Sequence, residues 1–216
     1  LFSGSSQLNE GMGRQGNELI WRWQGEEVRF ALSQLQLKGA HNIENVMAAM
    51  IPALLEGCPT EIAWQAVCGF QGLEHRMNMV RELDGVCWYN DSKGTNVGSV
   101  LKSLSGLDYP VTLIAGGKDK GGDYSLLRPL LEERVSDLIL LGEASDRMEK
   151  ELHGSCRIHQ VASLDEAVQV AHRITRTSGT VLLSPACSSF DMFENFARRG
   201  EEFCRLVLQL ETEEMV

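Results

Sequence analysis

Polar and apolar residues alternate near the start of the chain. Residues 18–23 and 28–32 both show this alternation, and the polar stretch 24–27 separates them. A period of two residues is typical of a strand with one buried face. The sequence therefore predicts a β-hairpin within residues 1–30.

The pattern then changes to a helical one. Apolar residues between Ile43 and Leu54 recur at the spacing of one helix face, and the turn-forming residues 57–59 end the run. A second helix is predicted over 61–70, with Thr60 as its N-cap. Residues 71–76 break the periodicity, so we expect a domain boundary there.

Beyond this boundary the pattern is that of an α/β domain. Residues 77–83 and 86–90 flank Asp84-Gly85, a strong signal for a tight hairpin. Short apolar runs at 111–115, 138–141 and 181–183, with a weaker one at 157–161, are typical of strands covered on both faces. Amphipathic segments alternate with them at 96–105, 123–134, 144–152, 164–176 and 191–210.

This alternation predicts a doubly wound fold for residues 73–216. We expect a mostly parallel sheet with helices on both faces and an antiparallel strand from the first hairpin partner. The 216 residues allow one large domain or two small ones, and the boundary favours two.

Charge and cysteine content narrow the class of protein. Lys and Arg number 20 against 30 Asp and Glu, so the net charge of −10 argues against nucleic-acid and anionic-membrane partners. No apolar run approaches the ~20 residues of a membrane span. The six cysteines form no CxxC pair, which favours reduced, mostly buried thiols and a cytoplasmic location. We expect a monomer.

Three polar loops follow predicted strands, where open α/β sheets bind ligands. In loop 90–96, Lys93 suits a phosphate, but a solvated turn with Asp91 or Thr95 as N-cap explains the same residues. In the glycine-rich loop 116–123, two lysines could meet an anion, or the loop could be a surface turn.

The third loop, 184–189, has hydroxyls that could bind a carboxylate, while a simple serine N-cap is the plainer interpretation. Outside these loops, Asn42 could cap its helix, and Arg76 could reach a phosphate or be a solvated residue of the boundary. No cluster suggests a metal site.

Taken together, five motifs resemble those of the Mur ligases of peptidoglycan synthesis, most closely of the members that add D-glutamate. In order along the chain they are LKGAHNIEN at 37–45, GLEHR at 72–76, NDSKGTN at 90–96, GGKDK at 116–120 and LSPACSSFD at 183–191.

The resemblance implies a particular domain organisation. Residues 1–72 would be the C-terminal part of a central ATP-binding domain, and 73–216 a complete Rossmann-like, amino-acid-binding domain. The P-loop, the Mg²⁺ ligands and a modified lysine of the family would precede this sequence. We therefore expect a fragment that is inactive alone, with ATP and Mg²⁺ as cofactors.

The resemblance also implies site residues. His41, Asn42 and Asn45 match the stretch that contacts adenine. Arg76 and Asp91 match residues that hold the ribose and phosphates, and Lys93 lies beside the phosphates. Lys93 and Arg76 would be the catalytic cations. The D-glutamate pocket would comprise Thr95, Lys120, Ser189, the backbone of Phe190, and Phe196.

The implied reaction is ATP-driven amide-bond formation. The L-alanyl carboxylate of UDP-N-acetylmuramoyl-L-alanine would become an acyl phosphate, which the amine of D-glutamate attacks. Two alternatives remain open: another Mur ligase or a folylpolyglutamate synthase-like ligase, and a module that binds a nucleotide or amino acid without catalysis.

Overall fold

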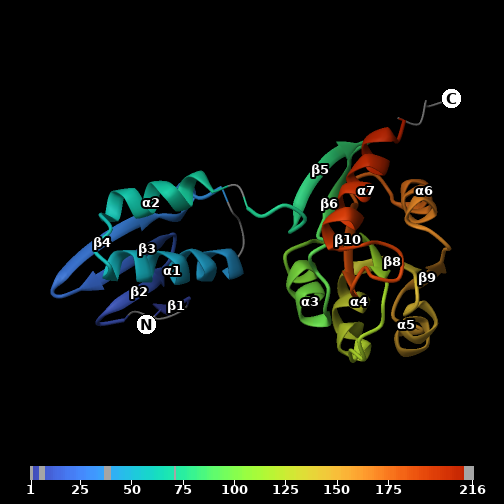
Figure 1. Ribbon diagram of the computed structural model, residues 1–216, viewed down its shortest axis with the longest axis horizontal. Helices are drawn as coiled ribbons and strands as arrows, with labels where there is room; N and C mark the ends of the chain where they lie inside the picture. The colour runs from blue at the N-terminus through green and yellow to red at the C-terminus, as the bar shows by residue number, and fades with distance from the viewer. Residues whose placement is uncertain (1, 5–7, 37–39, 71, 212–216) are drawn as a thin grey trace. The chain divides into compact units, whose positions relative to one another are not determined.

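The computed structural model describes residues 2–4, 8–36, 40–70 and 72–211. The chain forms two compact units, Leu1–Gly72 and Leu73–Val216. Each unit has its own sheet and its own buried core, and each is shown in Figure 1.

The first unit packs two helices on a four-stranded sheet of order β1-β2-β3-β4. Met47 and Met50 are fully buried against the sheet, and Trp64 stacks on Phe30 with ring centroids 4.8 Å apart. The elements are β1 Phe2–Ser3, β2 Gly11–Gln15, β3 Glu18–Trp23, β4 Glu26–Ala31, the 3₁₀ turn η1 Leu32–Gln34, α1 Ala40–Leu55 and α2 Thr60–Gly69.

The predicted hairpin is confirmed as β3 and β4, with a shorter turn than expected. Gln24 and Gly25 have φ values of 51° and 85°, the left-handed pair that a two-residue turn requires. Both predicted helices are confirmed. Thr60, however, is the first residue of α2 rather than its cap, because Pro59 holds the N-cap position.

The second unit has the predicted mostly parallel sheet, in the order β5-β6-β10-β7-β8-β9. Only β5 is antiparallel, and the Asp84-Gly85 turn joins it to β6. The elements are β5 Asn78–Leu83, β6 Val86–Asn90, α3 Val97–Ser105, β7 Val111–Gly116, η2 Tyr124–Leu127, α4 Arg128–Arg134, β8 Val135–Leu141, α5 Ser145–Leu152, β9 Arg157–Gln160, α6 Leu164–Ile174, β10 Thr180–Ala186 and α7 Phe196–Gln209.

Helices cover both faces of this sheet, as predicted (Figure 1). On one face, α3, α4 and α5 bury side chains such as Leu104 and Met148. On the other, α6 and α7 bury side chains such as Val168 and Phe203. The last strand, β10, lies between β6 and β7, so the loops after these three strands meet at one edge of the sheet.

Three further sequence predictions need correction, two about this unit and one about the cysteines of the whole chain. The last helix begins at Phe196 rather than near 191, because Asn195 caps it by accepting a hydrogen bond from the Arg198 amide. The helix expected over 123–134 is divided into η2 and α4. The six thiols of the chain are all free, but only Cys187 is buried and the other five are partly exposed.

Across the described residues, no helix is long and apolar enough to cross a membrane.

Asp137 joins β8 to the edge strand β9 and yields a test of the fold. Only 2% of its side chain is exposed, and it accepts two hydrogen bonds from Arg157, at 2.9 and 2.8 Å, and one from His159 at 3.0 Å. Burial raises the pKa of Asp137, but the bonds from Arg157 and His159 outweigh burial and hold it below its usual value.

We predict that Asp137→Asn lowers the free energy of unfolding by about 1–3 kcal/mol at pH 7, because charge-assisted bonds are lost. The folded carboxyl has the lower pKa, so its contribution is full above the unfolded pKa and disappears as the pH falls through the folded one. Urea unfolding from pH 2 to 7 measures this. Asp108→Asn, at an exposed carboxylate, should change nothing; equal effects from both variants would contradict the prediction.

Candidate functional site

The three loops that the sequence singled out come together at the carboxyl edge of the second sheet. The Ala186 amide donates to the carbonyl of Gly94 at 2.8 Å, and the Lys118 amide donates to the carbonyl of Ser188 at 2.9 Å. Gly117 has a φ of 129°, and a Cβ there would collide with the Ser188 carbonyl. The approach of the β7 loop to the β10 loop therefore requires glycine.

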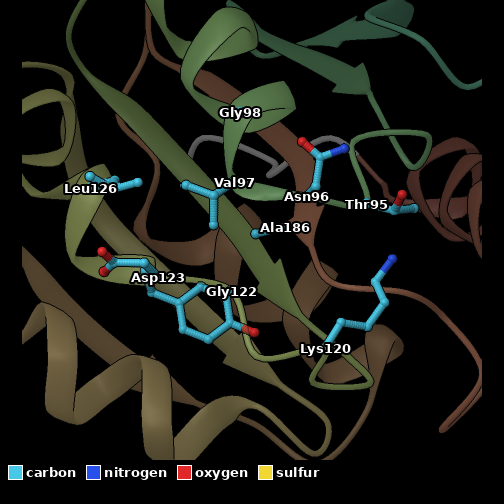
Figure 2. A pocket seen from close by; sticks show the side chains of 10 residues that line it. Thr95, Asn96, Val97, Gly98, Lys120, Gly122, Asp123, Leu126 and Ala186 are labelled. Carbon is cyan, nitrogen blue, oxygen red and sulfur yellow. The ribbon is translucent and has the colours of Figure 1, made fainter.

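A pocket of about 310 Å³ opens between these loops (Figure 2). Thr95 and Lys120, both predicted to bind substrate, line it together, and the Lys120 side chain extends toward Thr95. Asn96, not Asp91 or Thr95, caps α3 by accepting from the Ser99 amide. The full lining is Thr95, Asn96, Val97, Gly98, Lys120, Gly122, Asp123, Tyr124, Leu126 and Ala186.

The two lysines of the glycine-rich loop differ in their partners. Lys118 forms an ion pair with Glu143 at 2.7 Å, and this hydrogen bond raises the pKa of Lys118. Lys120 is exposed and makes no ion pair with any described residue. Lys120 is therefore the lysine of this loop whose charge can meet an anion in the pocket.

Asp91, expected at the nucleotide, is buried instead. Only 3% of the residue is exposed, and its Oδ2 accepts hydrogen bonds at 2.7 Å from the hydroxyls of Ser103 and Ser184. Burial raises the pKa of Asp91, and these hydrogen bonds and the charge of Arg76 offset that effect only in part. The carboxylate thus joins the β6 loop to α3 and β10.

Arg76 lies in a constrained segment that packs against the β6 loop. Its neighbours His75 and Met77 both have left-handed φ values, 61° and 50°. The His75 carbonyl accepts from the Lys93 amide at 2.9 Å, and its ring lies 3.0 Å from the Asn90 amide nitrogen. Arg76 and Lys93 are both exposed, so their charges can reach a ligand.

Phe196, expected in the amino-acid pocket, contacts Lys93. The Lys93 ammonium sits 4.0 Å from the centroid of the Phe196 ring, a cation–π arrangement. The Phe196 carbonyl accepts from the Ser92 hydroxyl at 2.7 Å. Phe196 does not line the described pocket.

Ser189 and Phe190 are not among the residues that line the pocket. Ser189 is 2% exposed, and its carbonyl accepts from the amides of Met192 and Phe193. Phe190 is 71% exposed. Neither Ser188 nor Ser189 caps a helix, because α7 begins seven positions beyond Ser189, after its cap Asn195.

The three residues expected at adenine belong to the first unit, at the start of α1. The side chain of His41 lies outside the described residues. Asn42 and Asn45 are three positions apart and so share a face of the helix. Asn42 is inside the helix, which starts at Ala40, so the N-cap interpretation of this residue is wrong.

Arg199 is an element of the site that the sequence did not reveal. It is 2% exposed, donates to the hydroxyl and carbonyl of Ser92 at 3.0 Å each and to the Cys187 carbonyl at 3.3 Å, and so joins the β6 and β10 loops. Burial lowers the pKa of Arg199 to about 10. One signal was available: Arg199 shares a helix face with the buried Phe203, four positions on.

Within the described ranges, no group of three or more His, Cys, Asp and Glu side chains could hold a metal ion.

The buried position of Asp91 leads to a prediction that separates an internal role from a ligand-binding one. Asp91→Ala leaves two buried hydroxyls without an acceptor, so we expect the free energy of unfolding to fall by about 2–5 kcal/mol. Asp91→Asn keeps an acceptor oxygen and should cost less. Urea unfolding measures both, with Asp165→Ala at an exposed site as the control, expected within about 0.5 kcal/mol. Unchanged stability in Asp91→Ala would show that the carboxylate is not an internal anchor.

The sequence of this chain matches a known protein family and several curated relatives. Residues 75–187 match the family model described as the Mur ligase, glutamate ligase domain. A relative from Syntrophotalea carbinolica, named UDP-N-acetylmuramoylalanine–D-glutamate ligase, is 62% identical over 97% of this chain and 47% of its own length. The chain thus spans about half the length of the curated relatives it matches.

Solved structures share the fold at low sequence identity. A pseudomurein peptide ligase type C from Methanothermus fervidus superposes with a TM-score of 0.66 at 15% identity, over 82% of this chain and 39% of that one. A bifunctional folylpolyglutamate synthase/dihydrofolate synthase from Yersinia pestis, solved with AMPPNP and a Mn ion, has a TM-score of 0.60 at 15% identity, over 91% and 46%. With the family model matching more than half of its residues, this chain belongs to the Mur ligase family.

Proposed function

We propose that this chain is the C-terminal half of an ATP-dependent ligase that joins D-glutamate to UDP-N-acetylmuramoyl-L-alanine. The observation that carries the proposal is the pocket that unites Thr95 and Lys120 from two separate loops. The name of the 62% identical relative supports the same substrate pair.

The chemistry of D-glutamate fits the pocket. The amino acid has two carboxylates and an ammonium, so it needs a cation and neutral donors. Lys120 supplies an exposed positive charge, and Thr95 supplies a hydroxyl. The pocket also takes in the start of α3, and the N-terminus of a helix favours an anion. Ser189 would act through the β10 loop, where it is buried and its carbonyl accepts from the amides of Met192 and Phe193.

The phosphate side of the reaction is assigned to Arg76 and Lys93. Both are exposed cations held on ordered backbone, and their charges would neutralise negative charge that develops as the amine attacks an acyl phosphate. Phe196 would orient Lys93 through its ring. Asp91 would hold the β6 loop that carries Lys93, rather than touch the nucleotide.

ATP would supply the phosphoryl group that activates the substrate carboxylate, and Mg²⁺ would be held by residues outside the described site. The first unit would contribute adenine contacts through His41, Asn42 and Asn45. The second unit would orient the amine of D-glutamate for attack, which lowers the entropic barrier of the bimolecular step.

The test is an activity assay on a fusion of the preceding half of the Syntrophotalea carbinolica relative with this chain. Phosphate release with ATP, UDP-N-acetylmuramoyl-L-alanine and D-glutamate measures ligation, and the 216-residue chain alone, expected to be inactive, serves as the blank. We predict that Lys120→Ala raises the KM for D-glutamate about tenfold or more, since a charge-assisted hydrogen bond is lost, and leaves the KM for ATP unchanged.

Lys118→Ala is the matched control, because Lys118 lies in the same loop but pairs with Glu143. It should leave the KM for D-glutamate within about twofold, and Ser189→Ala and Thr95→Ala should have smaller effects than Lys120→Ala. If Lys120→Ala and Lys118→Ala behaved alike, the assignment of Lys120 to the amino acid would be wrong.

A further inference from the structure

Arg147 of α5 holds the loop that carries Lys120 from outside the pocket, and Glu151 of the same helix accepts from the Tyr124 amide at 3.0 Å. Arg147 Nη1 donates to both carboxylate oxygens of Asp119, at 3.1 and 2.9 Å. Its Nη2 donates to the carbonyl of Gly122 at 2.7 Å. One planar guanidinium therefore fixes the chain on both sides of Lys120 and leaves the lysine side chain unconstrained.

Asp119 extends this arrangement through the rest of the loop. Its Oδ1 also accepts from the Gly121 amide at 2.9 Å and from the Tyr124 hydroxyl at 2.9 Å. Tyr124 lines the pocket, and the centroid of its ring lies 5.1 Å from the Arg147 guanidinium carbon. Arg147 thus contacts the loop by hydrogen bonds and by a cation–π contact.

The charge of Arg147 is already balanced by its neighbours. Besides Asp119, it pairs with Glu151, which accepts from Nε at 2.8 Å. The hydrogen bond from Arg147 is the main cause that lowers the pKa of Asp119 to about 2, so this carboxylate is ionised at neutral pH. Arg147 does not line the pocket, and the free charge at the loop belongs to Lys120.

We propose that Arg147 is a positioning residue that holds Lys120 where a carboxylate of the amino-acid substrate binds. This inference rests on the proposed function. A loop that is ordered in advance loses less conformational entropy when the ligand binds, so fixing the loop increases affinity without a direct contact. Lysine cannot replace Arg147, because its single ammonium cannot bind two carboxylate oxygens and a carbonyl in one plane.

The kinetic test uses Arg147→Lys in the fusion enzyme. This variant keeps the positive charge but loses the planar guanidinium that binds Asp119 and the Gly122 carbonyl together. The KM for D-glutamate should therefore rise about tenfold, while kcat and the KM for ATP stay within about twofold. Arg205→Lys is the matched control: Arg205 also donates from more than one nitrogen, in its case to Glu202 at 2.8 and 2.7 Å, but it lies on α7. It should change none of these constants.

A double variant shows whether Arg147 acts through Lys120. If it does, adding Arg147→Lys to Lys120→Ala leaves the KM for D-glutamate at the value of Lys120→Ala alone. Multiplicative effects of the two substitutions would overturn the proposal. An increase with Lys120→Ala but none with Arg147→Lys would also overturn it and leave the proposed function intact, whereas no increase with Lys120→Ala would count against the proposed function itself.

Hydrogen exchange in the 216-residue chain gives a readout that needs no activity. The Gly121 amide donates a hydrogen bond to Asp119, so Arg147→Lys should speed hydrogen exchange at this amide. The amides of β7 and α5 should keep their exchange rates. Arg205→Lys should leave Gly121 unchanged. Unaltered exchange at Gly121 in Arg147→Lys would show that the guanidinium does not order the loop.

Discussion

The pairing of β10 with both β6 and β7 is the constraint on which the rest of the second unit depends. β10 is the last strand in the chain, yet it runs parallel to both neighbours and separates them in the sheet. Because the three strands point the same way, the loops that follow them meet at one edge. Segments that follow β6 and β7 form most of the pocket lining, and Ala186 at the end of β10 completes it (Figure 2).

Two buried charges keep these walls in place, and exposed charges remain for ligands. Asp91 binds hydroxyls from α3 and β10, and Arg199 binds backbone and side-chain oxygens of the β6 and β10 loops. A buried charge is costly unless it is well bonded, so removing one partner disturbs several loops at once. Lys93 follows Ser92, which this network holds, whereas the backbone around Lys120 is held by Arg147 and Asp119.

Much of the fold could be predicted because the relevant signals are local. The Asp84-Gly85 turn and the short apolar runs fix a hairpin and several buried strands from neighbouring residues alone. The order of the strands could not be predicted, since no local pattern records that β10 enters between β6 and β7. The start of α7 lies later than the sequence predicts because Asn195 caps the helix after the irregular segment that follows β10.

In the candidate site, too, features with a local sequence signal could be predicted and features that depend on tertiary packing could not. The resemblance to the Mur ligase motifs singled out Thr95 and Lys120, and the pocket unites them. The sequence could not reveal that Asp91 is used internally, because its partners Ser103 and Ser184 are distant along the chain. Arg147 was equally hidden: its role depends on α5 lying next to the glycine-rich loop, which only tertiary packing determines.

We propose that one pocket, lined by the segments after β6 and β7 and by the end of β10, binds an amino acid with two carboxylates. Nuclear magnetic resonance of the ¹⁵N-labelled chain, titrated with D-glutamate, tests this most directly. The account predicts that the amide signals of Thr95, Lys120 and Gly122 move together with one saturation curve, while Gly25 in the β3–β4 turn does not move. Signals of the pocket that stay fixed at saturating D-glutamate, or that move no more than Gly25, would contradict it.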